Sequence, residues 1–294
     1  MLVMKNLKKP TIIVTKDHPI DAKWVKPSSR LYLAIVTRSE LRLWDPSKAK
    51  IIWSVTCKEL LSKGSKMKDT IFFRCVTCTH DAVCLGTSDG QVLILREPKK
   101  SRGTLSCDLI LGTVKSGLCP ITCICADPDS KTLAAGNGMG MIFVWACIDK
   151  SSTYEDTMKF LMNKKQDSPC MTIAIRESYV VAGFDSGHIR IFSMKRKGSM
   201  IPAVEVAAHA RCITALAFHP KKNIFATVGE DTSFNVWKMP DRLGKLKNDS
   251  VHIELIHSAI HKDVLFTGIV MTKNSVICSA YDQMVLFEFR RGSK

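Results

Sequence analysis

The sequence predicts an all-β fold of repeated small sheets, because one pattern of apolar runs and tight turns recurs along its 294 residues. Each copy has an apolar run, a polar turn, a second apolar run, a tight Gly/Asp turn and a third, alternating run. Alternation with a period of two is typical of strands, and turns such as Ser88-Asp89-Gly90 supply the positive φ that a tight hairpin needs. The six copies occupy Tyr32–Asp45, Phe72–Leu95, Ile121–Trp145, Cys170–Phe192, Cys212–Trp237 and Leu265–Phe289.

The period of the repeat indicates which β fold is formed. A large apolar residue closes each copy, and successive closing residues are 45 to 51 positions apart. They are Trp44, Leu95, Trp145, Phe192, Trp237 and, approximately, Phe287. A period of roughly 40 to 50 residues with four short strands per unit predicts a β-propeller. Helical periodicity is faint and confined to Ser151–Lys164.

Short motifs make the chain resemble the WD-repeat family. They are LWD at Leu43–Asp45, VW at Val144-Trp145 and Val236-Trp237, and the stretch AHARCITALAFHP, which leads into VGEDTSFNVW. The resemblance implies a hydrogen-bonded tetrad in the fifth copy. Its members would be His209, Thr227, Asp231 and Trp237. In such a tetrad the buried polar groups satisfy one another.

Other copies have lost most of these polar residues. Leu95 and Phe192 replace the tryptophan, and Leu85 and Ala135 occupy the position of the hydroxyl on the second strand. We expect these copies to depend more on apolar packing.

The number of blades stays open at the level of sequence. Within the family, the order of the repeats and the ending AYDQMVLFEFR resemble one group, whose members carry an additional amino-terminal segment of about one blade. In the six-bladed interpretation, Pro10–Thr15 supplies the outer strand of the last blade and closes residues 1–294 into a single domain. The alternative is a seven-bladed parent that lacks an amino-terminal portion here.

Composition favours an intracellular, cytoplasmic protein. The start, MLVMKNLKKP, has no apolar core typical of a signal peptide, and no stretch approaches the roughly 18 apolar residues of a membrane span. Twelve cysteines without a framework spacing fit a reducing compartment. We expect them to be mostly buried and reduced.

The sequence predicts no catalytic residues, no metal and no cofactor. A nucleophile elbow, a P-loop and a zinc-protease motif are all missing. The loop Gly136–Gly140 is interpreted as a hairpin turn rather than a nucleotide loop, because it joins two strands. The stretch Cys75–Cys84 has three thiols and one imidazole, from Cys75, Cys78, Cys84 and His80, with spacing that suggests zinc, but Cys84 aligns with buried alanines of other copies. His252, His257 and His261 are interpreted as structural or surface residues.

The charge of the chain is its most informative functional feature. The formal net charge is +16. Loops after first strands and loops after third strands share one face of a propeller and are rich in lysine and arginine, which predicts that this face is strongly basic. The loops after first strands contribute Lys26, Arg30, Lys131, Lys221, Lys222 and Lys273. Such a face attracts an acidic partner. Aromatic residues do not interleave with these lysines, so nucleic acid is not favoured. The alternative is that these lysines bind no partner and serve only to keep the protein soluble.

The chain ends on the string FRRG, at Phe289–Gly292, which phosphoinositide-binding propellers also use. In those proteins the motif lies inside the propeller, whereas here only Ser293 and Lys294 follow. The favoured interpretation of Arg290 and Arg291 is the solvated end of a strand, and a lipid site is the alternative.

Together these observations predict a non-catalytic scaffold that binds other proteins and no small-molecule substrate. The alternative is a peripheral membrane protein that binds phosphoinositides through the basic face. The predicted contact residues are Arg211, Lys99, Lys100, Arg102, Lys195, Arg196, Lys197, Lys245 and Lys247.

Overall fold

The computed structural model describes most of the chain. The described residues are 13, 15, 17–27, 30–61, 71–79, 82–97, 104–112, 119–127, 132–147, 154–160, 168–195, 199–240, 252–283 and 285–290. Within them lie six antiparallel sheets, and the chain divides into two compact units at residues 156 and 157. Each unit is described by itself, and the prediction of one domain over residues 1–294 stays a prediction.

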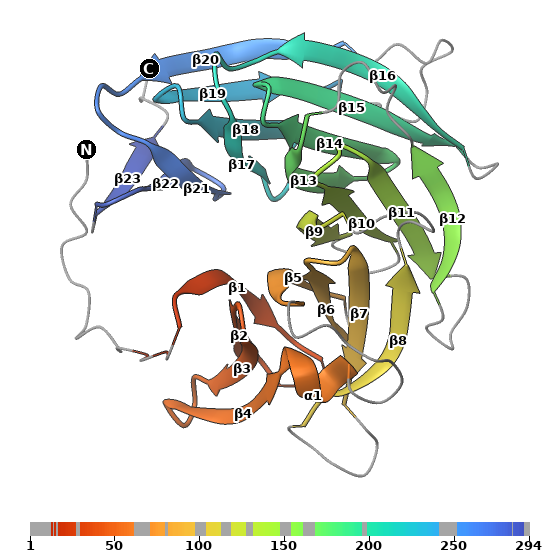
Figure 1. Cartoon of the computed structure of the whole chain (residues 1–294). Coiled ribbons are helices and arrows are strands. Elements are labelled where there is room, and N and C mark those ends of the chain that lie inside the picture. Colours follow the sequence, from red (N-terminus) through yellow and green to blue (C-terminus); the bar gives the residue numbers. More distant parts are fainter. Residues whose placement is uncertain are drawn as a thin grey trace. The chain divides into compact units, whose positions relative to one another are not determined.

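The first unit contains three four-stranded sheets and one short helix (Figure 1). The first sheet comprises β1 (Pro19–Val25), β2 (Tyr32–Thr37), β3 (Glu40–Asp45) and β4 (Lys50–Thr56), which is followed by α1 (Cys57–Leu61). The second comprises β5 (Phe73–Cys78), β6 (Ala82–Thr87), β7 (Gln91–Arg96) and β8 (Ser106–Gly112). The third comprises β9 (Ile121–Ala126), β10 (Thr132–Asn137), β11 (Ile142–Cys147) and β12 (Tyr154–Phe160), whose last residues pass into the second unit.

The second unit also contains three sheets. The fourth sheet comprises β13 (Cys170–Arg176), β14 (Tyr179–Phe184), β15 (His188–Lys195) and β16 (Ser199–Ala207). The fifth comprises β17 (Ile213–Phe218), β18 (Ile224–Gly229), β19 (Ser233–Lys238) and β20 (Glu254–Ile260). The sixth has three strands within the described residues, namely β21 (Phe266–Met271), β22 (Ser275–Ala280) and β23 (Leu286–Arg290).

Every sheet is a meander in which consecutive strands pair antiparallel. The first strand of each sheet carries a register shift near its start, as between Ile213 and Ala215 in β17. Four outer strands share a second bulge beside the closing residue of the third strand, for example between Val236 and Trp237 of β19. Bulges at equivalent positions increase the local twist in the same way in each sheet. The repeat in sequence is therefore also a repeat in backbone geometry.

The core of each unit lies between neighbouring sheets. First strands of successive sheets contact one another, as β13 does with β17 and β17 with β21. Phe225 and Trp237 pack with Ile189 and Ile191 between the fourth and fifth sheets. Between the fifth and sixth sheets, Phe234 and Phe266 belong to one buried cluster. Full burial of such a side chain contributes about 1.5 to 3 kcal/mol, so these clusters hold successive sheets together.

The structure confirms the six repeats and corrects two details. The register pairs Val276 with Phe289, as it pairs Phe225 with Trp237, so the residue that closes the sixth repeat is Phe289 rather than Phe287. The faintly helical stretch contains a strand instead, β12. Tertiary pairing with β11 overrides a weak local periodicity there.

Two further predictions concern the amino-terminal segment and membrane-spanning helices. Most of Pro10–Thr15 lies outside the described residues, so its role as a closing strand stays a prediction. Among the described residues, no helix is long and apolar enough to cross a membrane.

Tight turns between second and third strands place one residue at positive φ. In the second to the sixth sheets these residues are Gly90 (φ 87°), Gly140 (φ 76°), Gly187 (φ 79°), Thr232 (φ 63°) and Asp282 (φ 56°), whereas the described turn of the first sheet has none. Gly187 has a further role, because its carbonyl oxygen accepts the N–H groups of Ala208 and His209, both at 3.0 Å. A Cβ on Gly187 would overlap the carbonyl oxygen of His209. The turn of the fourth sheet therefore fixes the chain that enters the fifth.

We predict that Gly187→Ala lowers the free energy of unfolding by about 2 to 4 kcal/mol, because positive φ and a backbone clash both disfavour the methyl group. Urea denaturation followed by circular dichroism measures the loss. Gly138→Ala is the matched control, since its Cβ would lie 3.5 Å from Pro120 Cγ and Gly138 is not at positive φ. Equal losses in the two variants would contradict this account of Gly187.

Candidate functional site

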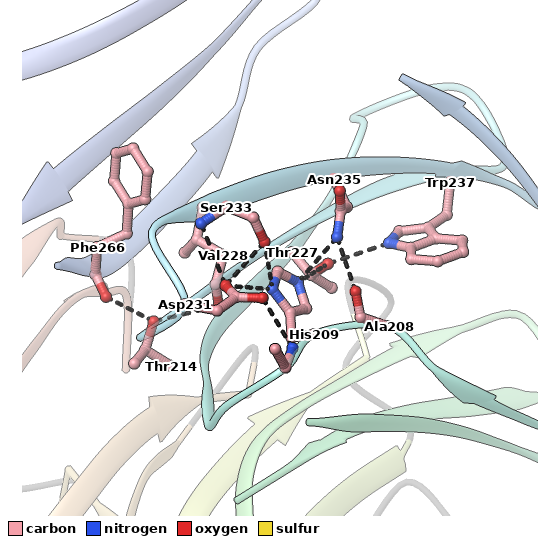
Figure 2. Close-up of polar contacts among 11 residues, drawn as sticks. Ala208, His209, Thr214, Thr227, Val228, Asp231, Ser233, Asn235, Trp237 and Phe266 are labelled. Atoms are coloured by element: carbon pink, nitrogen blue, oxygen red, sulfur yellow. Dashed lines mark hydrogen bonds and ion pairs between the residues drawn. The ribbon is translucent and has the colours of Figure 1, made fainter. Parts of the chain in front are cut away.

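The four residues of the predicted tetrad meet in the fifth sheet (Figure 2). His209 lies between β16 and β17, Thr227 on β18, Asp231 in the following turn, and Trp237 on β19. Asp231 Oδ1 is 2.9 Å from His209 Nδ1, and His209 Nε2 is 2.8 Å from Thr227 Oγ1. Trp237 Nε1 is 3.0 Å from the same hydroxyl oxygen. The four side chains thus form one continuous chain of hydrogen bonds.

The donors fix the tautomer of the histidine. The indole N–H of Trp237 can only donate, so Thr227 Oγ1 accepts it and gives its own proton to His209 Nε2. His209 Nδ1–H then donates to the carboxylate of Asp231. This arrangement needs a neutral imidazole, and each buried polar group in it has a partner.

The pKa values of the ion-forming members agree with that assignment. Burial lowers the pKa of His209, and the neighbouring Asp231 only partly opposes this effect. For Asp231, burial raises the pKa, but hydrogen bonds from His209, Ser233 and the Ala210 N–H outweigh it and the net pKa is lowered. At neutral pH the site therefore holds a neutral imidazole beside a carboxylate.

Three further groups complete the site, and sequence reasoning missed them. Ser233 Oγ is 2.7 Å from Asp231 Oδ1 and 2.9 Å from His209 Nδ1. The Ala210 N–H donates to Asp231 Oδ2 at 2.9 Å, and Asn235 Nδ2 donates to the carbonyl of Ala208 at 2.9 Å. A hydroxyl two positions after an aspartate is a known turn signal that could have identified Ser233.

In the second and third sheets, the turn equivalent to that of Asp231 is held by a local hydrogen bond. Thr87 Oγ1 accepts the Gln91 N–H at 3.0 Å, and Asn137 Oδ1 accepts the N–H groups of Met139 and Met141. The positions that lost the polar groups hold fully buried apolar side chains, which are Leu85, Leu95, Ala135 and Phe192. The turn Gly138–Gly140 joins β10 and β11, which confirms the hairpin interpretation.

A second candidate site gathers three loops of the second unit around His219. We call it the His219 loop cluster; it comprises the residues 176–178, 219–223 and 272–274. His219 is buried, its Nδ1 accepts the N–H groups of Lys221 and Lys222 at 3.0 Å, and its Nε2–H donates to the Lys273 carbonyl at 3.2 Å. Arg176 Nη2 donates to the carbonyls of His219 and Lys222. Arg176 and His219 thus tie together loops from three successive sheets.

The His219 loop cluster is basic. The side chains of Lys221, Lys222 and Lys273 are exposed, and Arg176 adds a fourth cation. Glu177 is the one acidic residue among the described residues of these three loops. These lysines lie in loops after first strands, and nothing in the sequence indicated Arg176 or His219 as their support.

The loops of the same unit that lie at the tetrad end of the sheets have the opposite sign. Acidic residues outnumber basic ones among their described residues. The acidic residues are Asp185, Glu230, Asp231, Asp263 and Asp282, and the basic residues are Arg211 and Lys262. Arg211 is exposed, with Nη2 3.7 Å from Glu230 Oε2. Arg211 therefore lies at the acidic end, near the tetrad.

Most of the other predicted contact residues cannot be placed. Lys195 is the last residue of β15, but its side chain is outside the described part of the structure. Lys99, Lys100, Arg102, Arg196, Lys197, Lys245, Lys247 and Arg291 lie outside the described residues altogether. Arg290 ends β23, is exposed, and its Nη2 is 2.9 Å from Glu288 Oε2. Its hydrogen bond lowers the pKa of Glu288.

The ten cysteines whose side chains the structure describes are mostly buried, as predicted. Cys75 lies on β5 and Cys84 on β6, both in a hydrophobic cluster, and His80 lies outside the described residues. Burial raises the pKa of Cys57, Cys212 and Cys278 to about 12. Among the described residues, no group of His, Cys, Asp and Glu has the arrangement of a metal site.

Comparison with known proteins gives one family and one fold. A family model described as WDR54 matches residues 13–294. WD repeat-containing protein 54 of Homo sapiens is 21% identical over 289 residues, which cover 96% of this chain and 78% of that protein. The Mus musculus protein of the same name is 20% identical over 261 residues, covering 87% and 71%.

A solved structure shows the same fold. The β-propeller domain of Cps50 (Swd1) from Myceliophteria thermophila is similar with a TM-score of 0.68 and 12% sequence identity, covering 95% of this chain and 84% of that chain. The predicted propeller fold and the predicted likeness to one group of WD-repeat proteins are therefore confirmed.

We predict that Thr227→Val lowers the free energy of unfolding by about 2 to 4 kcal/mol, because it leaves Trp237 Nε1–H buried without a partner and His209 Nε2 with only the long contact to Asn235 Nδ2, at 3.5 Å. Thr267→Val, at an exposed hydroxyl on β21, is the control and should change stability by less than about 0.5 kcal/mol. Urea denaturation measures both. Additive losses in Thr227→Val combined with Trp237→Phe would contradict a shared hydrogen-bond chain.

We predict that the lowered pKa of His209 makes stability depend on pH. The stability from this group is fully present above about pH 6.5 and falls as the pH drops below it, because the unfolded chain then binds a proton that the folded chain does not. The slope is at most about 1.4 kcal/mol per pH unit, and it ends below the folded pKa. Urea midpoints between pH 5 and 8 measure it, and His209→Gln should reduce the slope. An unchanged slope in that variant would assign the effect to other histidines.

Proposed function

We propose that this chain, which belongs to the WDR54 family, is a non-catalytic protein-interaction scaffold whose basic face binds an acidic segment of a partner protein. The observation that carries the proposal is the His219 loop cluster, where buried hydrogen bonds hold exposed lysines from neighbouring sheets in one place.

The tetrad supports a structural rather than a catalytic role. The side chain of His209 is 0% exposed, so its imidazole is not accessible to a substrate. Both of its nitrogen atoms already have partners within the sheet. The thiols of Cys57, Cys212 and Cys278, with pKa values of about 12, are protonated at neutral pH and are therefore weak nucleophiles.

Fixed loops make the basic face suitable for binding. The backbone of Lys221, Lys222 and Lys273 is held by His219, so these residues do not have to order a loop when a partner binds. Arg176 Cζ also lies 5.0 Å from the centroid of the Phe218 ring, which holds the guanidinium in place. Acidic loops at the tetrad end of the same sheets would orient a charged partner toward this end.

The framework also connects the cluster to the other basic stretches of the sequence. The Met194 N–H donates to the Ser178 carbonyl, beside Lys195. Asn223 Nδ2 donates to the carbonyl of Pro240, the last described residue before the stretch that contains Lys245 and Lys247. Among the described residues, the proposed binding face therefore extends from the His219 loop cluster to Met194 and Pro240.

A protein partner is favoured over a lipid headgroup at the chain end. Arg290 is already paired with Glu288, so an anionic headgroup would have to compete with a carboxylate of the same strand. A cytoplasmic location is part of this proposal, and it follows from the cysteine content that fits a reducing compartment.

We predict that Lys221→Glu/Lys222→Glu/Lys273→Glu weakens binding of a fluorescein-labelled polyglutamate peptide about tenfold or more, since each exposed pair contributes about 0.2 to 1 kcal/mol. Fluorescence anisotropy at low and physiological salt measures the affinity. Three exposed cations outside the cluster provide a control with the same change in net charge, Lys23→Glu/Arg38→Glu/Lys58→Glu, which should bind close to wild type.

Two outcomes would overturn the proposal. Equal weakening in both triple variants would show that net charge alone drives binding. Co-sedimentation with phosphoinositide vesicles but not with neutral vesicles, together with loss of that binding in Arg290→Thr/Arg291→Thr, would make the chain a membrane-binding protein.

A further inference from the structure

The outer strand of the fifth sheet, β20, has an unoccupied edge in the described structure. β20 pairs with β19 on one side, and no other described strand pairs with it. The N–H of His261 donates to the carbonyl of Thr232 at 3.0 Å, so the amide of His261 points into the sheet. Because backbone groups alternate along an antiparallel strand, those of Ser258 and Ile260 point away from β19. A free row of donors and acceptors remains there.

The side chains along this edge are unusually apolar for an exposed strand. Ile260 is 73% exposed, Leu255 is 49% exposed and Ile256 is 43% exposed. An exposed apolar edge is a template for pairing with another strand. The outer strand of the fourth sheet, β16, is protected differently, because Pro202 interrupts its row of N–H donors. β20 contains neither proline nor lysine.

The sequence of β20 complements itself when two copies run antiparallel. If Ser258 of one copy faces Ser258 of the other, Ile256 of each copy faces Ile260 of its partner. In the same register Glu254, the one acidic residue of the strand, lies opposite the turn that follows the partner's strand and carries Lys262, and small residues occupy the centre. Apolar pairs and opposite charges directly across a strand pair are both stabilising. The bulge beside Trp237 lies at Ile256, so Ser258–Ile260 keeps a regular edge.

We infer that β20 is a self-association surface, at which a second copy of this chain adds its own β20 antiparallel in the Ser258 register. The two copies are related by a two-fold axis, so the same patch serves both and the assembly closes as a dimer. The mutual hydrogen bonds of Ser258 and the Ile256–Ile260 contacts hold the strands, and attraction between Glu254 and Lys262 in the turn after the partner's strand favours this register.

Sedimentation of the full chain over a concentration series tests this surface. Wild type should change from monomer to dimer with concentration. Ile260→Lys should weaken dimerisation about tenfold or more, because it places a charge in the apolar pair. Glu254→Lys should weaken it by charge repulsion, and Glu254→Lys/Lys262→Glu should restore it. Val270→Lys, at a side chain on β21 that is 52% exposed, is the matched control and should dimerise like wild type.

The Glu254→Lys/Lys262→Glu variant distinguishes this interface from non-specific association. Urea midpoints of the variants should stay near that of wild type, since the substituted side chains are exposed. A wild-type chain that remains monomeric throughout the series would refute the inference. So would a dimer that Val270→Lys weakens as much as Ile260→Lys, or one that the double swap fails to restore.

Discussion

A small sheet with two apolar faces has to lie between two neighbours, and this constraint shapes the rest of the structure. Every residue of β6 and of β14 is buried, which a single four-stranded sheet in water cannot achieve. Within each unit the sheets therefore stack through their faces, with first strands in contact. The pattern changes in β22, where buried and half-buried residues alternate, because the described structure covers only one face of the sixth sheet. Burial of both faces is thus the condition for an inner sheet, and the repeat supplies it.

The polar tetrad is compatible with this apolar environment because it is complete. Thr227 accepts one hydrogen bond and donates another, so neither Trp237 nor His209 is left with an orphaned buried group. The second sheet replaces both the hydroxyl and the indole, with Leu85 and Leu95, whereas the third keeps the indole of Trp145 and has Ala135 at the position of the hydroxyl. Removing both partners of a buried hydrogen bond is tolerated far better than removing one, which explains how the second sheet keeps its geometry without the polar pair.

Because the sheets are rigid, the candidate binding surfaces are the loops at the ends of the sheets and the exposed strand edges. In the second unit the His219 loop cluster gathers lysines at one end of the sheets, while the loops near the tetrad are mainly acidic. The outer strand β20 adds an apolar edge at a third position. The three surfaces are chemically different and lie on one framework, so a partner segment and a second copy of the chain would not have to compete. This separation is what a scaffold requires.

The sequence by itself determined the six repeats, the strand class and the four tetrad residues, because alternation, turn chemistry and a short motif are local signals. It misplaced the sixth closing residue at Phe287, since register depends on pairing with Val276. It gave no sign of Arg176 and His219 as links between the lysine loops, because the carbonyl oxygens that they bind in other loops are more than forty residues away in the chain. Only the tertiary structure decided which lysines lie together and which strand edge carries exposed apolar side chains. Both are properties of packing between segments that are distant in the chain.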